Sequence, residues 1–189
     1  MTGMTICGYI WATFLVVWLI LAIKTKPVQH RETVSSRLSY TIVTFAAFYL
    51  VFAGEVRAPW LRLHILPANA IVEALGVVLT AAGIALAFWA RAFLGGNWSG
   101  TVTVKVGHQL VRTGPYRWVR HPIYSGLILA LIGTAIERRQ VRGAIAVILL
   151  YIGFKIKSRI EERTMTNTFG AEYADYSRTT GAIVPKLPF

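Results

Sequence analysis

The sequence has few acidic residues and only one cysteine, and each scarcity excludes a class of protein. Asp and Glu number 8 against 20 Lys and Arg, and charged residues make up 15% of the 189 positions. Soluble globular domains carry about 25% charged residues, so a soluble domain is not indicated. The single cysteine, Cys7, excludes an intrachain disulfide, and no Cys/His cluster has metal-ligand spacing. We therefore expect neither a disulfide framework nor a bound metal ion.

Nucleotide-binding and hydrolase motifs are also missing. The chain contains no Walker-type phosphate loop, no GxSxG nucleophile elbow and no GxGxxG dinucleotide fingerprint. The net charge of +12 does not indicate a nucleic-acid partner, because the basic residues lie between apolar runs rather than along one polar face. Lys24-Thr25-Lys26 follows the first apolar run where a removable signal peptide has small residues, so we expect this run to be retained.

The sequence contains several long hydrophobic segments. Hydrophobic residues make up 55% of the chain, and the mean hydropathy is +0.54. Five apolar segments cover residues 6–23, 40–54, 70–90, 122–136 and 143–156. A bilayer-spanning helix needs about 20 residues, so the three shorter segments require flanking aromatic or long basic side chains. The pattern predicts one all-α domain over residues 1–189, a multi-pass transmembrane bundle of about five helices ending in a helical hairpin.

The distribution of basic residues predicts the orientation of this bundle. Of the 20 Lys and Arg, 15 lie in segments 24–39, 91–121 and 155–189, and the other 5 lie in the two remaining connections. Cytoplasmic loops carry the excess of positive charge, so these three segments are expected to face the cytoplasm. The prediction is an integral membrane protein of the bacterial inner membrane, or of the endoplasmic reticulum in a eukaryote.

Residues capable of chemistry are confined to two polar blocks on that side. The first, at 107–124, reads GHQLVRTGPYRWVRHPIY. Pro122 suits the first turn of a helix, whose exposed N–H groups favour a carboxylate or phosphate, and Tyr116 and His121 are able to donate to the same group. A helix start with interfacial side chains explains this block equally well on its own.

The second block begins with Glu161-Glu162, which are expected at the C-terminal end of the fifth helix, a few residues after its apolar segment. Acidic residues at a helix C-terminus oppose the helix dipole, so the pair calls for another explanation. One is a solvated pair that neutralises the preceding Lys155, Lys157 and Arg159. The other is a carboxylate that accepts hydrogen bonds from ligand hydroxyls or an amine, with nearby aromatic residues closing a cytoplasmic cofactor pocket.

These blocks resemble the isoprenylcysteine carboxyl methyltransferase family and related phospholipid methyltransferases, membrane enzymes that use S-adenosyl-L-methionine. The resemblance rests on Gly-His-x-Leu-Val at 107–111, Gly-x-Tyr at 114–116, Arg-His-Pro-x-Tyr-x-Gly at 120–126, Glu-Glu at 161–162 and Phe-Gly-x-Glu-Tyr at 169–173. It covers residues 97–189, the expected catalytic region, whereas residues 1–96 match only as hydrophobic helices.

The resemblance implies a set of site residues. The implied cofactor-binding residues are His108, Gln109, Leu110, Val111, Tyr116, His121, Pro122, Ile123, Tyr124 and Glu161. Residues near the fourth helix would hold the methionine carboxylate, Glu161 would accept from ribose hydroxyls or the amino group, and Leu110 and Val111 would face adenine. Arg120, Arg159 and Glu162 are the candidate catalytic residues, and Lys157 and Arg159 are the candidate substrate-binding residues.

The type of methyl acceptor is inferred from its protonation state at neutral pH. A carboxylate is ionised at neutral pH, so it needs positioning and a cation but no general base. An amine must first lose a proton, which would require a base such as Glu162. We therefore expect O-methylation of a lipidic or prenylated acceptor at the membrane. The alternatives are a phospholipid N-methyltransferase and a non-enzymatic basic membrane protein that binds anionic membrane lipids.

Overall fold

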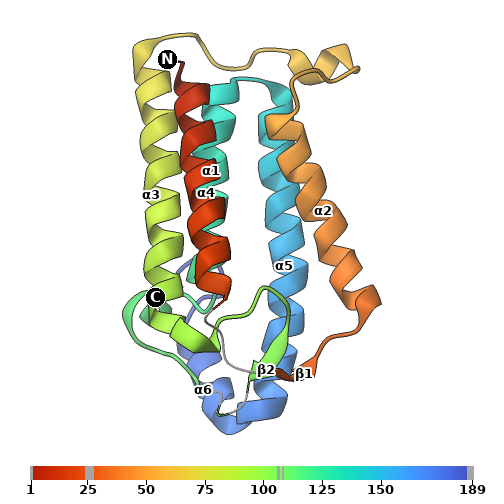
Figure 1. Cartoon of the computed structure of the whole chain (residues 1–189), viewed down its shortest axis with the longest axis vertical. Coiled ribbons are helices and arrows are strands. Elements are labelled where there is room, and N and C mark those ends of the chain that lie inside the picture. Colours follow the sequence, from red (N-terminus) through yellow and green to blue (C-terminus); the bar gives the residue numbers. More distant parts are fainter. Residues whose placement is uncertain (1, 24–27, 106, 108, 187–189) are drawn as a thin grey trace.

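The computed structural model describes residues 2–23, 28–105, 107 and 109–186 and confirms the predicted all-α membrane bundle. Its helices are α1 (Gly3–Ala22), α2 (Val34–Phe52), α3 (Ala70–Leu94), α4 (Pro122–Arg138), α5 (Val141–Phe169) and α6 (Ala171–Thr179). The first five correspond to the five apolar segments, and they run along one common direction (Figure 1). Two short strands, β1 (Val28–Arg31) and β2 (Thr103–Lys105), pair antiparallel at the lower end of the bundle.

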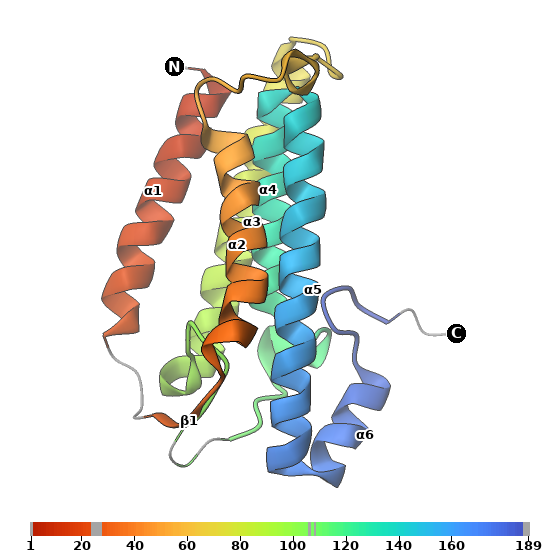
Figure 2. The same cartoon turned by 90° about the vertical axis from the view of Figure 1, so that its right-hand side faces the viewer.

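Successive long helices run in opposite directions, so the connections between them lie alternately at the two ends of the bundle. Helix α3 packs against α1 and α4, and α2 packs against α5. Helices α4 and α5 form the predicted hairpin, because Arg139 adopts a left-handed conformation (φ 55°) and turns the chain directly into α5. As Figure 2 shows, the start of α4 and the end of α5 therefore lie at the same end of the molecule, next to α6.

Glycines allow α3 and α4 to approach closely. A methyl group on Gly83 would lie 2.3 Å from the backbone nitrogen of Ala130, and one on Gly133 would lie 2.4 Å from that of Thr80. Small residues in the third segment thus serve packing inside the chain, as expected for membrane helices. This contact fixes the direction of α4, whose first turn carries part of the polar block.

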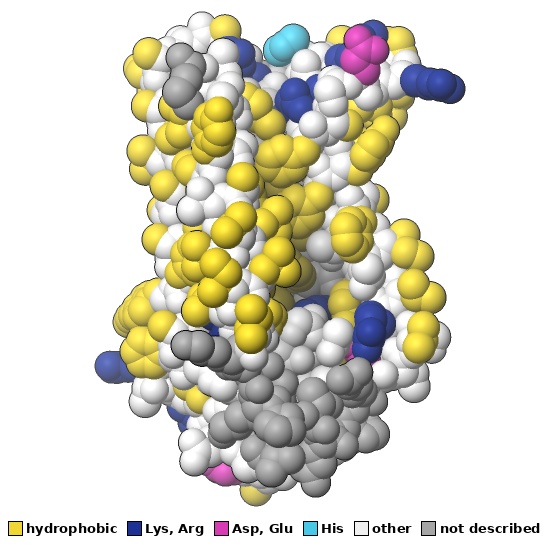
Figure 3. Space-filling model, viewed as in Figure 1, with side chains coloured by type: hydrophobic (Ala, Val, Ile, Leu, Met, Phe, Trp, Pro, Cys, Tyr) yellow, Lys and Arg dark blue, Asp and Glu magenta, His cyan; other side chains and the backbone are white. Residues whose placement is uncertain are grey.

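Within the described part of the chain, three helices are long and apolar enough to span a bilayer, namely Gly3–Ala22, Val34–Phe52 and Ala70–Asn97. Large apolar side chains such as Leu19, Ile42 and Ile71 are exposed on them, as expected for surfaces that face lipid. Figure 3 shows hydrophobic side chains spread over the surface of the helical part. Helix α4 has 17 residues, and α5 has 29, of which the part after Phe154 is rich in charge. The second half of α5 therefore extends beyond the apolar layer and carries Glu161 and Glu162 outside it.

Candidate functional site

A cavity of about 970 Å³ lies inside the bundle, and its two ends differ in chemistry. Its upper walls are aromatic side chains of α1 and α2, among them Trp11, Phe14, Phe48 and Phe52. Figure 3 shows the molecule hollowed between its two halves, with hydrophobic side chains on the walls. The lower end is polar and is lined by residues of both polar blocks. Such a cavity suits a ligand that has one polar and one apolar part.

The first polar block reaches the cavity through a tight turn. Gly114 has φ 59°, a conformation that favours glycine, and begins the 3-10 turn Gly114–Arg117, which buries Tyr116. The hydroxyl of Tyr176 in α6 donates to the carbonyl of Tyr116 at 2.6 Å. The backbone nitrogen of His121 donates to Ala182 O at 2.9 Å, so the C-terminal segment also supports the block.

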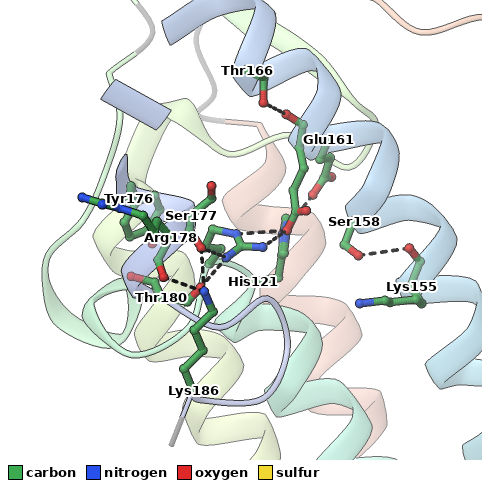
Figure 4. A network of polar contacts seen from close by, with 12 residues as sticks. His121, Lys155, Ser158, Glu161, Thr166, Tyr176, Ser177, Arg178, Thr180 and Lys186 are labelled. Carbon is green, nitrogen blue, oxygen red and sulfur yellow. Dashed lines mark hydrogen bonds and ion pairs between the residues drawn. The ribbon is translucent and has the colours of Figure 1, made fainter. Parts of the chain in front are cut away.

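The second polar block meets the first around Glu161. The hydroxyl of Tyr124 donates to Glu161 Oε1 at 2.6 Å, and His121 Nδ1 lies 3.3 Å from Glu161 Oε2. On its other side, His121 Nε2 lies 3.1 Å from Glu162 Oε1. Two segments about 40 residues apart in the sequence therefore form one buried polar cluster, which Figure 4 shows from close by.

Arg120 completes the cluster on the side away from the cavity's centre. Its Nε and Nη2 atoms donate to Glu162 Oε1 at 3.0 and 2.7 Å, and its Nη1 donates to the carbonyls of Ser177 and Thr180. Arg120 thereby connects the end of α5 to the segment after α6. Arg120 thus bonds both Glu162 and the backbone, and Glu162 Oε1 also contacts His121, which makes the pair a support for His121.

The charges in this cluster reinforce one another. Burial alone would lower the pKa of His121, but hydrogen bonds and attraction from Glu161 and Glu162 raise it above its ordinary value. Burial would raise the pKa of both carboxyls, yet His121 lowers the pKa of Glu161, and His121 with Arg120 lowers that of Glu162 to about 2. Both carboxylates are thus ionised at neutral pH, and the imidazole between them favours its protonated form.

Lys157 places a second cation on the cavity wall. Its Nζ donates to Gly100 O at 2.8 Å and lies 5.3 Å from the ring centroid of Tyr40 and 5.4 Å from that of Tyr124. Aromatic faces attract an ammonium group at such distances. Lys157 therefore holds the 97–103 segment against α5 and presents positive charge about one helical turn from Glu161.

The sequence of this region matches a known family. The model of the isoprenylcysteine carboxyl methyltransferase (ICMT) family matches residues 74–167, which include α4, most of α5 and the cluster around Glu161. The chain belongs to this family. The resemblance read from the two polar blocks is thereby confirmed.

Several relatives of the chain are known proteins. Protein-S-isoprenylcysteine O-methyltransferase of Saccharomyces cerevisiae is 35% identical over 79 residues, which cover 41% of this chain and 33% of that protein. The cobalt-zinc-cadmium resistance protein CzcN of Cupriavidus metallidurans is 29% identical over 147 residues, 77% of this chain and 61% of that protein. The solved structure of the eukaryotic intramembrane Ras methyltransferase ICMT matches with a TM-score of 0.62 and 27% identity, over 78% of this chain and 52% of that chain. The chain thus spans one third to three fifths of the length of these relatives.

Most of the residues that the family resemblance implied lie on the cavity wall. These are Gln109, Leu110, Val111, Tyr116, Arg120, His121, Ile123, Tyr124, Lys157 and Glu161. Pro122 is buried and opens α4 without lining the cavity, and Glu162 lies behind His121. His108 falls outside the described residues.

Arg159 lies apart from this group. It is exposed and lines a separate hollow of about 500 Å³ together with Glu162, Arg163, Thr166 and Asn167. Positions 157 and 159 are about 200° apart around a helix, so α5 turns Lys157 toward the cavity and Arg159 away from it. In the structure, Lys157 therefore lies on the wall of the large cavity near Glu161, and Arg159 does not.

The apolar walls of the cavity were not predicted from the sequence. The side chains of Trp11, Phe14 and Trp18 recur at helical spacing on α1, and those of Phe45, Phe48 and Phe52 do so on α2. This periodicity was visible in the sequence, but a stripe that faces lipid has the same pattern. Only the arrangement of α1 and α2 on two sides of one space distinguishes a ligand wall from a membrane surface.

Proposed function

We propose that this protein transfers the methyl group of S-adenosylmethionine to the carboxylate of a lipidic or prenylated acceptor. The observation that carries the proposal is the position of the ionised Glu161, on the wall of a cavity that is polar at this end and aromatic at the other. Membership of the ICMT family supports the same chemistry, as the names of the relatives in yeast and among solved structures do.

The polar end of the cavity fits the cofactor chemically. A carboxylate has about four acceptor positions, of which Tyr124 and His121 occupy two on Glu161, so ribose hydroxyls or an amino group have acceptors left. Leu110 and Val111 supply apolar contact for a flat base. The volume of about 970 Å³ is near the upper end of the range for ligand pockets, roughly 300–1,000 Å³. The bound cofactor supplies an electrophilic methyl group on a sulfonium centre.

The protonation states in the site favour an acceptor that arrives already ionised. His121 is held toward its protonated form, Glu162 has a pKa of about 2, and burial raises the pKa of Tyr116 well above its ordinary value. None of these groups is a ready base at neutral pH, whereas an amine acceptor requires one. A carboxylate needs only orientation, which the ammonium of Lys157 on the cavity wall provides. These groups therefore favour O-methylation over phospholipid N-methylation.

The aromatic part of the cavity fits the apolar tail of such an acceptor. Lining residues on α1 extend from Gly8 to Trp18, a rise of about 15 Å at ~1.5 Å per residue. A hydrocarbon chain along this wall would be removed from water over most of its length. Its polar head would then lie beside Lys157 and Glu161.

Binding of S-adenosylhomocysteine to the purified full-length chain in detergent tests the cofactor assignment. We expect saturable binding that Glu161→Gln weakens roughly 10- to 100-fold, since a charged hydrogen-bond acceptor is lost. Glu172→Gln is the matched control, because this exposed carboxylate of α6 pairs with Arg112 outside the cavity. Absence of binding, or equal loss in both variants, would contradict the proposal.

Methyl transfer to a membrane extract tests the acceptor class. After incubation with cofactor labelled in the methyl group, mild base releases the label of a methyl ester as volatile methanol, whereas the label of an N-methylated headgroup stays on nitrogen and is not volatile. We expect lipid-soluble label that base converts to volatile methanol. Label that survives base would instead establish the phospholipid N-methyltransferase alternative.

A further inference from the structure

The second half of helix α5 carries two rows of side chains on different faces, and the proposed function uses only one of them. Lys157, Glu161 and Met165, each four residues apart, line the large cavity. Arg159, Arg163 and Asn167 have the same spacing and line the separate hollow. The second row needs an explanation of its own because it faces away from the proposed site.

The basic charges in this hollow have no acidic partner among the residues that the structure describes. Arg159 and Arg163 are exposed, and neither makes an ion pair or hydrogen bond with any residue that the structure describes. Glu162 is the acidic residue on the hollow's rim, and its carboxylate is already paired with Arg120 and His121. Two guanidinium groups one helical turn apart therefore remain available for an anion.

The position of the hollow along α5 indicates which layer of the bilayer the bound anion would occupy. The apolar segment of α5 ends at Ile156, and Arg159 and Arg163 follow it by about 4.5 and 10.5 Å along the helix axis at ~1.5 Å per residue. The headgroup layer extends about 5–8 Å beyond the hydrocarbon on each side of a bilayer. Arg159 falls within this layer, and the long side chain of Arg163 is able to reach back to it.

We propose that Arg159 and Arg163, with Asn167 beside them, form a binding site for the phosphate headgroup of an anionic phospholipid. Guanidinium groups match phosphate oxygens through paired N–H donors, and the amide of Asn167 adds a further donor. The site follows the apolar segment of α5 at the height of the headgroup layer, so its occupant is a lipid of the surrounding leaflet. It is separate from the cavity that would take the methyl acceptor.

Native mass spectrometry of the full-length protein, titrated with phosphatidylglycerol or phosphatidylcholine, tests this site. We expect phosphatidylglycerol to bind more tightly and Arg159→Gln/Arg163→Gln to weaken it roughly tenfold or more, since each basic residue near an anionic surface contributes measurably. Arg112→Gln/Arg178→Gln is the matched control. This control also removes two positive charges at the same end of the molecule. Arg112 and Arg178 are exposed and pair with Glu172 and Asp175.

Three outcomes would overturn the proposal. Equal weakening in the test and control variants would indicate a general charge effect rather than a site. Equal binding of phosphatidylcholine would show that the anionic headgroup is not recognised. Displacement of phosphatidylglycerol by millimolar inorganic phosphate would assign the hollow to a soluble phosphate. Binding of S-adenosylhomocysteine, measured in the same variants, is expected to stay unchanged, which separates this test from that of the proposed function.

Discussion

His121 is held between two carboxylates, Glu161 on one ring nitrogen and Glu162 on the other. The imidazole is only 9% exposed, so its charge state depends mainly on these partners rather than on solvent. The family resemblance implies His121 and Glu161 as cofactor-binding residues and Arg120 and Glu162 as catalytic residues. The contacts of Glu162 and Arg120 also position His121, a role that motif spacing alone does not reveal.

This arrangement predicts a pH-dependent stability. The folded-state pKa of His121 is raised, so its stabilising contribution is complete below its unfolded pKa of about 6.5 and is lost as pH rises through the folded value. Glu162, with a folded pKa of about 2, contributes fully above about pH 4.3 and loses its contribution as pH falls toward 2. The cluster is therefore expected to stabilise the protein most between about pH 4.5 and 6.5.

Thermal unfolding of the wild type and His121→Asn in detergent measures this effect. We expect the difference between their midpoints to shrink when the pH rises from 6 to 9, by about 2–4 °C for each kcal/mol lost. His64→Asn, at an exposed position at the other end of the molecule, is expected to show no such trend. A difference that grows with pH would mean that His121 is not stabilised in its protonated form.

Substitution of Lys157 is expected to affect methyl transfer much more than cofactor binding. If its ammonium orients the acceptor carboxylate, Lys157→Met should leave S-adenosylhomocysteine binding within about threefold and reduce methyl transfer roughly 100-fold, equivalent to about 2.7 kcal/mol. Lys157→Arg keeps the charge and is expected to recover part of the rate. An equal fall in binding and turnover would show that Lys157 acts by holding Gly100 and the 97–103 segment in place.

At the level of elements, hydrophobicity located the helices but not their full lengths or rotations. The fifth helix was predicted to end near Glu161 and Glu162, whereas α5 continues to Phe169 because its charged residues extend the same helix out of the apolar layer. The sequence left Lys157 and Arg159 as equal candidates for the substrate. Which of two residues about 200° apart faces a cavity depends on how α5 packs against its neighbours, and this packing is a tertiary property.

The close contact between α3 and α4 leads to a prediction for Gly83. In Gly83→Ala, the added methyl group would lie 2.3 Å from Ala130 N and 2.4 Å from Gly126 O, so the two helices must separate. Overpacking of this kind costs about 1–3 kcal/mol, and we expect a clearly lower thermal midpoint in detergent. Gly8→Ala on α1 is the control, because nothing lies within 4 Å of its added methyl group. Equal midpoints for the two variants would contradict a tight α3–α4 contact.

At the level of the whole molecule, the hairpin of α4 and α5 explains why the two polar blocks meet. One block precedes α4 and the other ends the charged half of α5, so a chain that crosses and returns brings them to the same end. This meeting was predictable from the number of crossings. The cavity between α1 and α2 was not, because its aromatic walls have the same composition as surfaces that face lipid.

Of the 20 basic residues, 15 fall in the sequence segments 24–39, 91–121 and 155–189, and this predicts that the cavity's polar end, which the last two segments line, faces the cytoplasm. Single cysteines introduced by Arg178→Cys at this end and His64→Cys at the other, each in a Cys7→Ala background, test the orientation in bacterial spheroplasts. Both positions are exposed, and Cys7 is the only native cysteine. We expect a membrane-impermeant maleimide to modify position 64 in intact spheroplasts and position 178 only after permeabilisation. The reverse pattern would place Glu161 on the outer side, away from the cytoplasmic supply of cofactor, and would contradict the proposed methyl transfer together with the orientation.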